Sequence, residues 1–186
     1  MLLKKDWQHS KASDADHWLI VDQARLKDVL EYLYSTQEQP EWHYLYQGTA
    51  LQSLNNNGPL LIKADAALLD TWRNDSRWRD NTSLWITHEP SSASLISHLQ
   101  SLLLINNSRD IPCLFRFYVP DSLMAWGERI QGHTPRLLGP FHELVWFSEE
   151  QWWTLQQPNN EAAVIKNMTR LKLTREDEKA LEVITA

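Results

Sequence analysis

Cysteine, glycine and long hydrophobic runs are scarce in this sequence, and each scarcity excludes a class of protein. One of the 186 residues is cysteine, Cys113, which excludes an internal disulfide framework and is typical of a reducing compartment. Five glycines leave few backbone positions for loops that cradle phosphates. Apolar runs such as residues 102–105 are far shorter than the roughly 18 residues of a membrane span. Because no secretory signal is visible either, we expect a soluble, cytoplasmic protein without membrane insertion.

Positive charge is also scarce. Lysine and arginine number 18 against 24 aspartates and glutamates, so the net charge is −6. A short basic stretch, residues 166–175, is followed directly by Glu176, Asp177 and Glu178. A nucleic-acid-binding domain usually carries a dominant basic face, so we expect no nucleic-acid partner.

Tryptophan, by contrast, is abundant, with ten residues. Its side chain combines a large apolar area with one polar N–H, so it serves cores, protein interfaces and sugar-binding platforms alike. Core packing is the default interpretation. Ten tryptophans are nevertheless hard to bury in a chain of this length, so we expect one or two of them to line an interaction surface.

Strand-like and helix-like apolar patterns alternate along the chain, which predicts a layered α/β domain. Strands are predicted at residues 17–21, 42–46, 60–62, 84–87, 113–118 and 143–147. Helices are predicted between them, with Asp65 and either Ser91 or Ser92 as N-caps and Pro120 in a first turn. The expected architecture is a mixed sheet with flanking helices, plus a short C-terminal helical appendage.

Residues 156–160 have the composition of a linker, which places a boundary near Pro158. The chain then divides into an α/β lobe, residues 1–157, and a short helical tail, residues 158–186. Thr174 and Asp177 have the spacing of a capping box ahead of the tail helix. Such a short helix does not hold its structure alone in water, so its apolar side should dock on the lobe, on a partner, or on both in turn.

No pattern in the sequence points to catalysis or to a cofactor. Residues 127–134 nearly spell a phosphate loop, but His133 replaces the lysine and the first half lies on a predicted helix. The seven histidines form neither H-E-x-x-H nor H-x-x-x-H, and neither C-x-x-C nor G-x-S-x-G occurs. We therefore expect no enzyme activity, no bound metal and no cofactor.

Five segments resemble, in order and spacing, the adaptor chaperones for type VI secretion effectors. They are residues 17–24 (HWLIVDQA), 46–51 (YQGTAL), 58–65 (GPLLIKAD), 115–120 (FRFYVP) and 137–146 (LLGPFHELVW). The most specific feature is Arg116 inside the aromatic segment 115–118, followed by Pro120. Two features depart from the family pattern: Val119 stands where an aspartate commonly precedes the proline, and the C-terminal lobe is shorter.

The resemblance implies an adaptor chaperone that binds the N-terminal region of a toxic effector protein and helps to load it onto the type VI spike protein. It implies no catalysis and no cofactor. The candidate partner-binding residues are Arg116, Trp126, Trp152, Trp153, Leu171, Leu181 and Ile184. A tryptophan-rich carbohydrate-binding module is the alternative function, because exposed tryptophans stack on sugars, and a hydrolase comes third.

Arg116 and the tryptophan pair each have two interpretations. The guanidinium of Arg116 could grip a carboxylate of the partner with its planar fork. It could also pair with an internal acid and hold two elements together, which we favour because buried charges usually need a partner. If Trp152 and Trp153 lie on a strand, their side chains point to opposite faces, one inward and one toward solvent or a partner.

Overall fold

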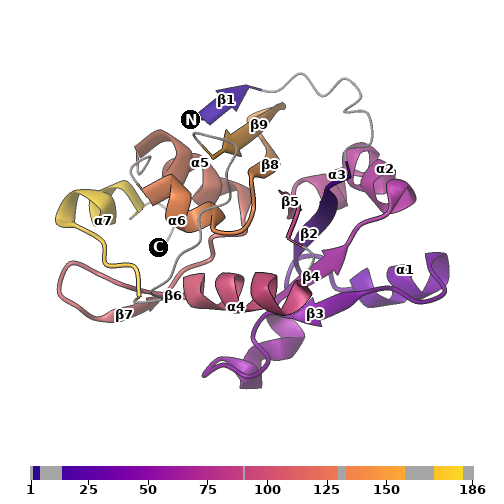
Figure 1. The fold of residues 1–186 in the computed structure, drawn as a ribbon, viewed down its shortest axis with the longest axis horizontal. Helices are drawn as coiled ribbons and strands as arrows, with labels where there is room; N and C mark the ends of the chain where they lie inside the picture. The colour runs from indigo at the N-terminus through magenta and orange to yellow at the C-terminus, as the bar shows by residue number, and fades with distance from the viewer. Residues whose placement is uncertain (1, 5–13, 90, 130–132, 158–169, 182–186) are drawn as a thin grey trace.

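The computed structural model describes residues 2–4, 14–89, 91–129, 133–157 and 170–181. Its centre is a seven-stranded sheet (Figure 1). In order across the sheet, the strands are β1 (Leu2–Lys4), β9 (Gln151–Gln156), β8 (Glu143–Ser148), β5 (Thr82–Thr87), β2 (Asp16–Asp22), β4 (Pro59–Lys63) and β3 (Trp42–Tyr44). The predicted α/β fold class is therefore confirmed.

All pairings between neighbouring strands of this sheet are antiparallel, in place of the mixed sheet that we expected. β2 and β3 follow one another along the chain through helix α1 (Val29–Thr36) and do run in the same direction. Strand β4 lies between β2 and β3 in the sheet, so β2 and β3 each pair with β4 in antiparallel orientation. The order of strands in space, which local sequence patterns do not encode, decided the type of sheet.

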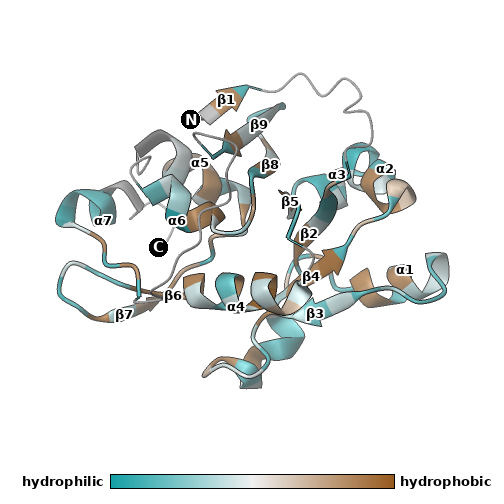
Figure 2. Ribbon diagram, viewed as in Figure 1, coloured by the Kyte–Doolittle hydropathy of each residue, from teal (hydrophilic) through white to brown (hydrophobic). Residues whose placement is uncertain are grey.

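Helices cover both faces of the sheet, and each face has its own apolar core. Alternate residues of β2 show the division, because Trp18 and Ile20 belong to one cluster whereas Leu19 and Val21 belong to the other. Helices α1, α2 (Ala66–Asn74) and α3 (Ser76–Arg79) pack on the second face. Helices α4 (Ser92–Leu102), α5 (Pro120–Arg129) and α6 (Thr134–Leu138) pack on the first. Brown and teal alternate along α1 and α4, as expected for helices with one apolar side (Figure 2).

The predicted helix starts are confirmed. The Asp65 side chain accepts a hydrogen bond from the N–H of Leu68 at 2.8 Å and caps α2. Ser91, rather than Ser92, is the N-cap of α4, and Pro120 is the first residue of α5. These signals act within one helical turn, so the local sequence is sufficient to define them.

The strand predicted over residues 113–118 is wrong. Only Pro112–Leu114 form a strand, β7, which pairs with β6 (Leu104–Asn106) in a separate two-stranded sheet. Residues 115–119 follow an irregular path into α5. Phe115, Phe117 and Tyr118 are all buried there, whereas alternate residues of a strand point to opposite sides. Burial of consecutive aromatic rings in one core thus overrides their preference for extended backbone.

Candidate functional site

Arg116 lies in this irregular segment and binds an acid of the central sheet. Its Nη2 donates a hydrogen bond to Oδ2 of Asp22 at 2.5 Å. Asp22 ends β2 and is only 1% exposed, whereas the Arg116 side chain is 40% exposed. Arg25 approaches the same oxygen at 3.6 Å. The structural interpretation of Arg116 requires such an internal acid as its partner. The exposed part of the Arg116 side chain remains accessible to another protein.

Two tyrosines extend the cluster around Arg116. The hydroxyl groups of Tyr46 and Tyr118 lie 3.4 Å apart, and burial raises the pKa of Tyr118 far above its ordinary value. Burial opposes the charged form of Arg116, yet hydrogen bonding to Tyr118 and the charge of Asp22 outweigh it and raise the pKa of Arg116. The arginine is therefore a permanent cation that joins β2 to the segment before α5.

The structure places Trp126 in the core. Its side chain is fully buried, and its ring stacks on Phe115 with the centroids 5.2 Å apart. In this conformation Trp126 has no surface with which to contact a partner. Trp18, Trp72, Trp78, Trp85 and Trp146 are also fully buried, and Trp7 lies outside the described residues.

Trp152 and Trp153 lie on β9 and point to opposite faces, as their adjacency predicts for a strand. Trp152 packs edge-on against Trp72 at 4.8 Å. Trp153 packs on the other face, where its Nε1 donates to the carbonyl of Ser148 and Lys4 lies 5.6 Å from its ring. Both side chains are half-buried, because each face of the sheet has its own helical layer.

The described part of the tail docks on the lobe. Leu171 and Leu173 are buried in the same cluster as α4 and α5, and both bond through their backbones to Asn106 of β6. Helix α7 (Arg175–Leu181) follows, and Thr174 and Asp177 exchange the two bonds of the predicted capping box at 2.9 and 3.1 Å. Pro158 and Ile184 lie outside the described residues, as does the side chain of Leu181.

Replacing Leu173 with alanine is expected to lower the free energy of unfolding by about 2–3 kcal/mol, because it leaves a cavity in the main core. Urea unfolding followed by tryptophan fluorescence measures the change. Lys172→Ala is the matched control, since this neighbouring side chain is exposed and its ion pair with Asp110 lies at the surface. The control should change stability by less than about 1 kcal/mol. Equal effects of both substitutions would contradict the docking of the tail.

Sequence reasoning missed a groove at the edge of the sheet. We call it the β3 groove, and its volume is about 350 Å³. It is lined by Trp42, His43, Tyr44, Gln47, Ile96 and Gln100. It lies between the edge strand β3 and helix α4. The strand order shows that β3 lies at an edge of the sheet. The local sequence of β3, Trp42-His43-Tyr44, does not show whether the strand lies at an edge or inside the sheet.

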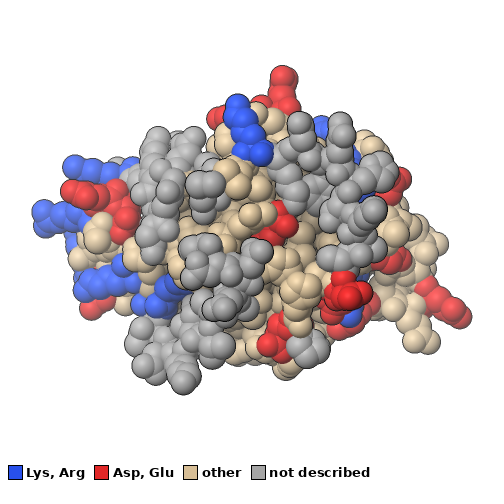
Figure 3. Space-filling view, turned by 45° about the horizontal axis from the view of Figure 1, so that its top comes forward, with Lys and Arg blue, Asp and Glu red and all other residues tan. Residues whose placement is uncertain are grey.

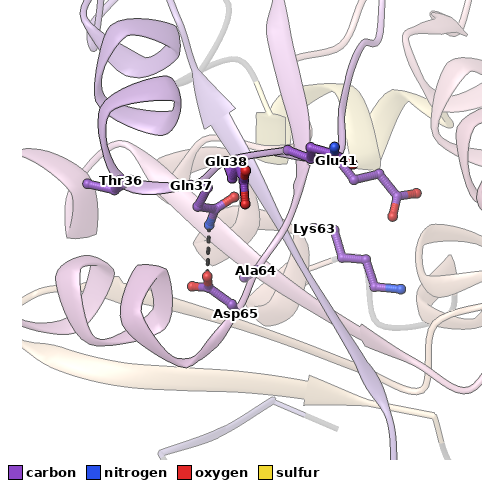
Figure 4. A pocket seen from close by; sticks show the side chains of 8 residues that line it. Thr36, Gln37, Glu38, Glu41, Lys63, Ala64 and Asp65 are labelled. Atoms are coloured by element: carbon purple, nitrogen blue, oxygen red, sulfur yellow. Dashed lines mark hydrogen bonds between the residues drawn. The ribbon is translucent and has the colours of Figure 1, made fainter.

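A second hollow, the acidic pocket, lies beside the first part of β3 (Figure 4). It is lined by Thr36, Gln37, Glu38, Gln39, Glu41, Lys63, Ala64 and Asp65, and its volume is about 450 Å³. Asp65 is engaged by Gln37, and Lys63 binds Asp16 at 2.9 Å. Glu38 and Glu41 therefore contribute negative charge that Lys63 does not neutralise.

The described residues include no group of three or more histidine, cysteine or acidic side chains suited to a metal ion. His88 and His142 stack at 4.8 Å, and His133, which replaces the lysine of the phosphate-loop pattern, lies 3.8 Å from Asp177. Within the same residues, no helix is both long and apolar enough to cross a membrane.

A family model described as a domain of unknown function, DUF4123, matches residues 17–134, which is more than half of the chain. The chain belongs to the DUF4123 family. This family is associated with adaptors of type VI secretion effectors. No curated protein and no solved structure matched the chain.

The DUF4123 match covers four of the seven strands of the central sheet. It contains the four adjacent strands β5, β2, β4 and β3, together with both partners of the Arg116–Asp22 pair. Strands β1, β9 and β8 lie outside the match and complete the sheet through the pairing of β8 with β5. The fifth resembling segment, residues 137–146, also lies beyond the match.

Proposed function

We propose that this protein is an adaptor chaperone that binds the N-terminal region of a toxic type VI effector and helps to load it onto the spike protein. The observation that carries the proposal is the DUF4123 match over residues 17–134. In this proposal the protein acts by binding and not by catalysis, and it needs no metal or cofactor. It works in the cytoplasm, before the effector is secreted.

The distribution of tryptophan and charge supports a protein partner. Six of the ten tryptophans are fully buried and cannot form a sugar-stacking platform, which weakens the main reason for the carbohydrate-binding alternative. Basic and acidic side chains lie side by side at the end that carries α7 (Figure 3). That arrangement does not provide the dominant basic face of a nucleic-acid-binding domain.

Co-expression is expected to raise the soluble yield of the cognate effector several-fold and to yield a complex that survives gel filtration. The reason is that a chaperone covers apolar surface through which its client would otherwise aggregate. The client to test is a candidate toxin whose gene lies beside the genes for this protein and for a spike protein. Soluble and total effector are measured by quantitative blotting after separate and joint expression.

An effector from an unrelated cluster, expressed in the same way, is the control and should gain nothing. Equal soluble yields with and without this protein, together with no co-purification, would refute the adaptor function. Retention of the protein on a polysaccharide column with release by free sugar would favour the carbohydrate-binding alternative.

A further inference from the structure

We propose that the outer edge of β3 receives an extended segment of the client as an added strand, with an apolar side chain in the β3 groove and a basic side chain at the acidic pocket. This inference rests on the proposed adaptor function and identifies the binding surface. The occupant is a protein segment in which an apolar residue and a lysine or arginine are two positions apart.

The register of β3 shows which backbone groups face outward. Lys63 donates its N–H to the carbonyl of Glu41 at 2.9 Å, and Leu45 donates its N–H to the carbonyl of Pro59 at 3.1 Å. His43, midway between Glu41 and Leu45, lies opposite Leu61. In an antiparallel pair, alternate residues bond to the neighbouring strand, so residues 41, 43 and 45 face β4.

Residues 42 and 44 consequently direct their backbone groups away from the sheet. Among the described residues, no strand pairs with this side of β3. The carbonyl of Tyr44 accepts a bond from Gln47 N–H, which leaves the N–H and C=O of Trp42 and the N–H of Tyr44 for an incoming strand. An extended peptide satisfies such groups by β-strand addition.

The β3 groove explains which side chain the incoming strand should carry. A residue placed opposite His43 projects to the same face as His43, toward Ile96 of α4. Gln100 is held by the carbonyls of Leu45 and Gln47, so this wall of the groove is ordered without a ligand. A volume of about 350 Å³ accommodates one large apolar side chain.

Charge complementarity explains the basic residue. Glu41 lies on the same face as His43, with 4.0 Å between its Oε1 and His43 Nε2. Glu38 and Glu41 are exposed, and Lys63, the cation lining the acidic pocket, is engaged by Asp16. A client residue two positions beyond the apolar one lies opposite Glu41, where a lysine or arginine would pair with it.

A second copy of this chain fits the edge less well than a client does. Two copies paired through β3 would bring Glu38 and Glu41 of both chains to one short edge, and each chain carries a net charge of −6.

Amide hydrogen exchange by NMR tests the site directly. The probes are short overlapping synthetic peptides that cover the N-terminal region of the cognate effector. In the free protein, the amides of Trp42 and Tyr44 should exchange fast and that of His43 slowly. A bound peptide should protect the amides of residues 42 and 44 selectively. Concentration-dependent protection of residues 42 and 44 without peptide would show a second copy on the edge and would overturn the proposal.

Two substitutions test the side-chain contacts by fluorescence anisotropy. Ile96→Ala should weaken peptide binding by about tenfold through lost apolar contact. Glu41→Lys should weaken it by about fivefold, with a loss that shrinks at high salt. The matched controls, Ile111→Ala and Glu31→Lys, change exposed residues that line neither hollow and should leave binding unchanged.

Co-purification of the full-length effector separates this inference from the proposed function. If the effector binds the wild type and the Ile96→Ala/Glu41→Lys double variant equally, the β3 site is wrong and the adaptor function stands. If the effector does not bind the wild type, both fail. Selective loss of binding by the double variant supports both.

Discussion

Replacing Arg116 with alanine is expected to lower the free energy of unfolding by about 2–3 kcal/mol, because it leaves the buried carboxylate of Asp22 without its main partner. The expected loss is smaller than for a fully buried pair for two reasons. Arg116 is partly exposed, and Arg25 remains 3.6 Å from the same oxygen. Urea unfolding at neutral pH measures the change.

Two further variants isolate the pair. Arg25→Ala is the matched control, since Arg25 is a mostly exposed cation near the same carboxylate, and its removal should cost less than about 1 kcal/mol. Adding Asp22→Asn to Arg116→Ala removes the unpaired charge and should recover part of the loss, which a double-mutant cycle quantifies. An unchanged melting temperature together with lost effector binding would instead assign Arg116 to the contact surface.

Gly139→Ala is expected to cost about 3 kcal/mol or more, because it combines backbone strain with a clash in the core. Gly139 follows α6 with φ at +54°, a conformation that side chains disfavour. An added Cβ would lie 2.2 Å from the ring of His98. That ring is buried, burial lowers the pKa of His98, and its Nε2 donates to the carbonyl of Leu137 at 2.9 Å, so it cannot move without breaking this bond.

Gly48→Ala provides the control for the backbone contribution alone. Gly48 has φ at +76°, but nothing lies within 4 Å of an added Cβ. Its substitution should therefore cost only about 1 kcal/mol. The difference between the two variants, measured by the same urea titration, reports the contact between Gly139 and His98. Equal losses would mean that the ring yields freely and that this part of the core is loosely packed.

The local sequence by itself determined the helix starts and the position of strand β2. Asp65, Ser91 and the Thr174–Asp177 box each bond within three residues, so no distant part of the chain is needed to place them. The two-sided apolar pattern of β2 likewise follows from adjacent residues pointing to opposite faces. Four of the five short segments that carry the resemblance lie within the DUF4123 match.

The turn between β8 and β9 is a feature that the local sequence does not predict. Glu149 and Glu150 both adopt positive φ, a conformation usually signalled by glycine or asparagine. Neither residue has that preference, so the hairpin forms because β8 and β9 pair along their whole length. The position of β9 next to β1, where Leu3 pairs with Thr154, could not be predicted from either strand.

Only the tertiary structure decided where the candidate site residues lie and what they contact. Trp126 has the same local character as a surface tryptophan, yet its ring fills the core beneath Phe115. The partner of Arg116 lies 94 residues away in sequence, and no local pattern links the two. Among the described residues, β3 is an edge strand because β4 occupies the place beside β2, so the binding surface that we propose depends on which strands become neighbours when non-local contacts form.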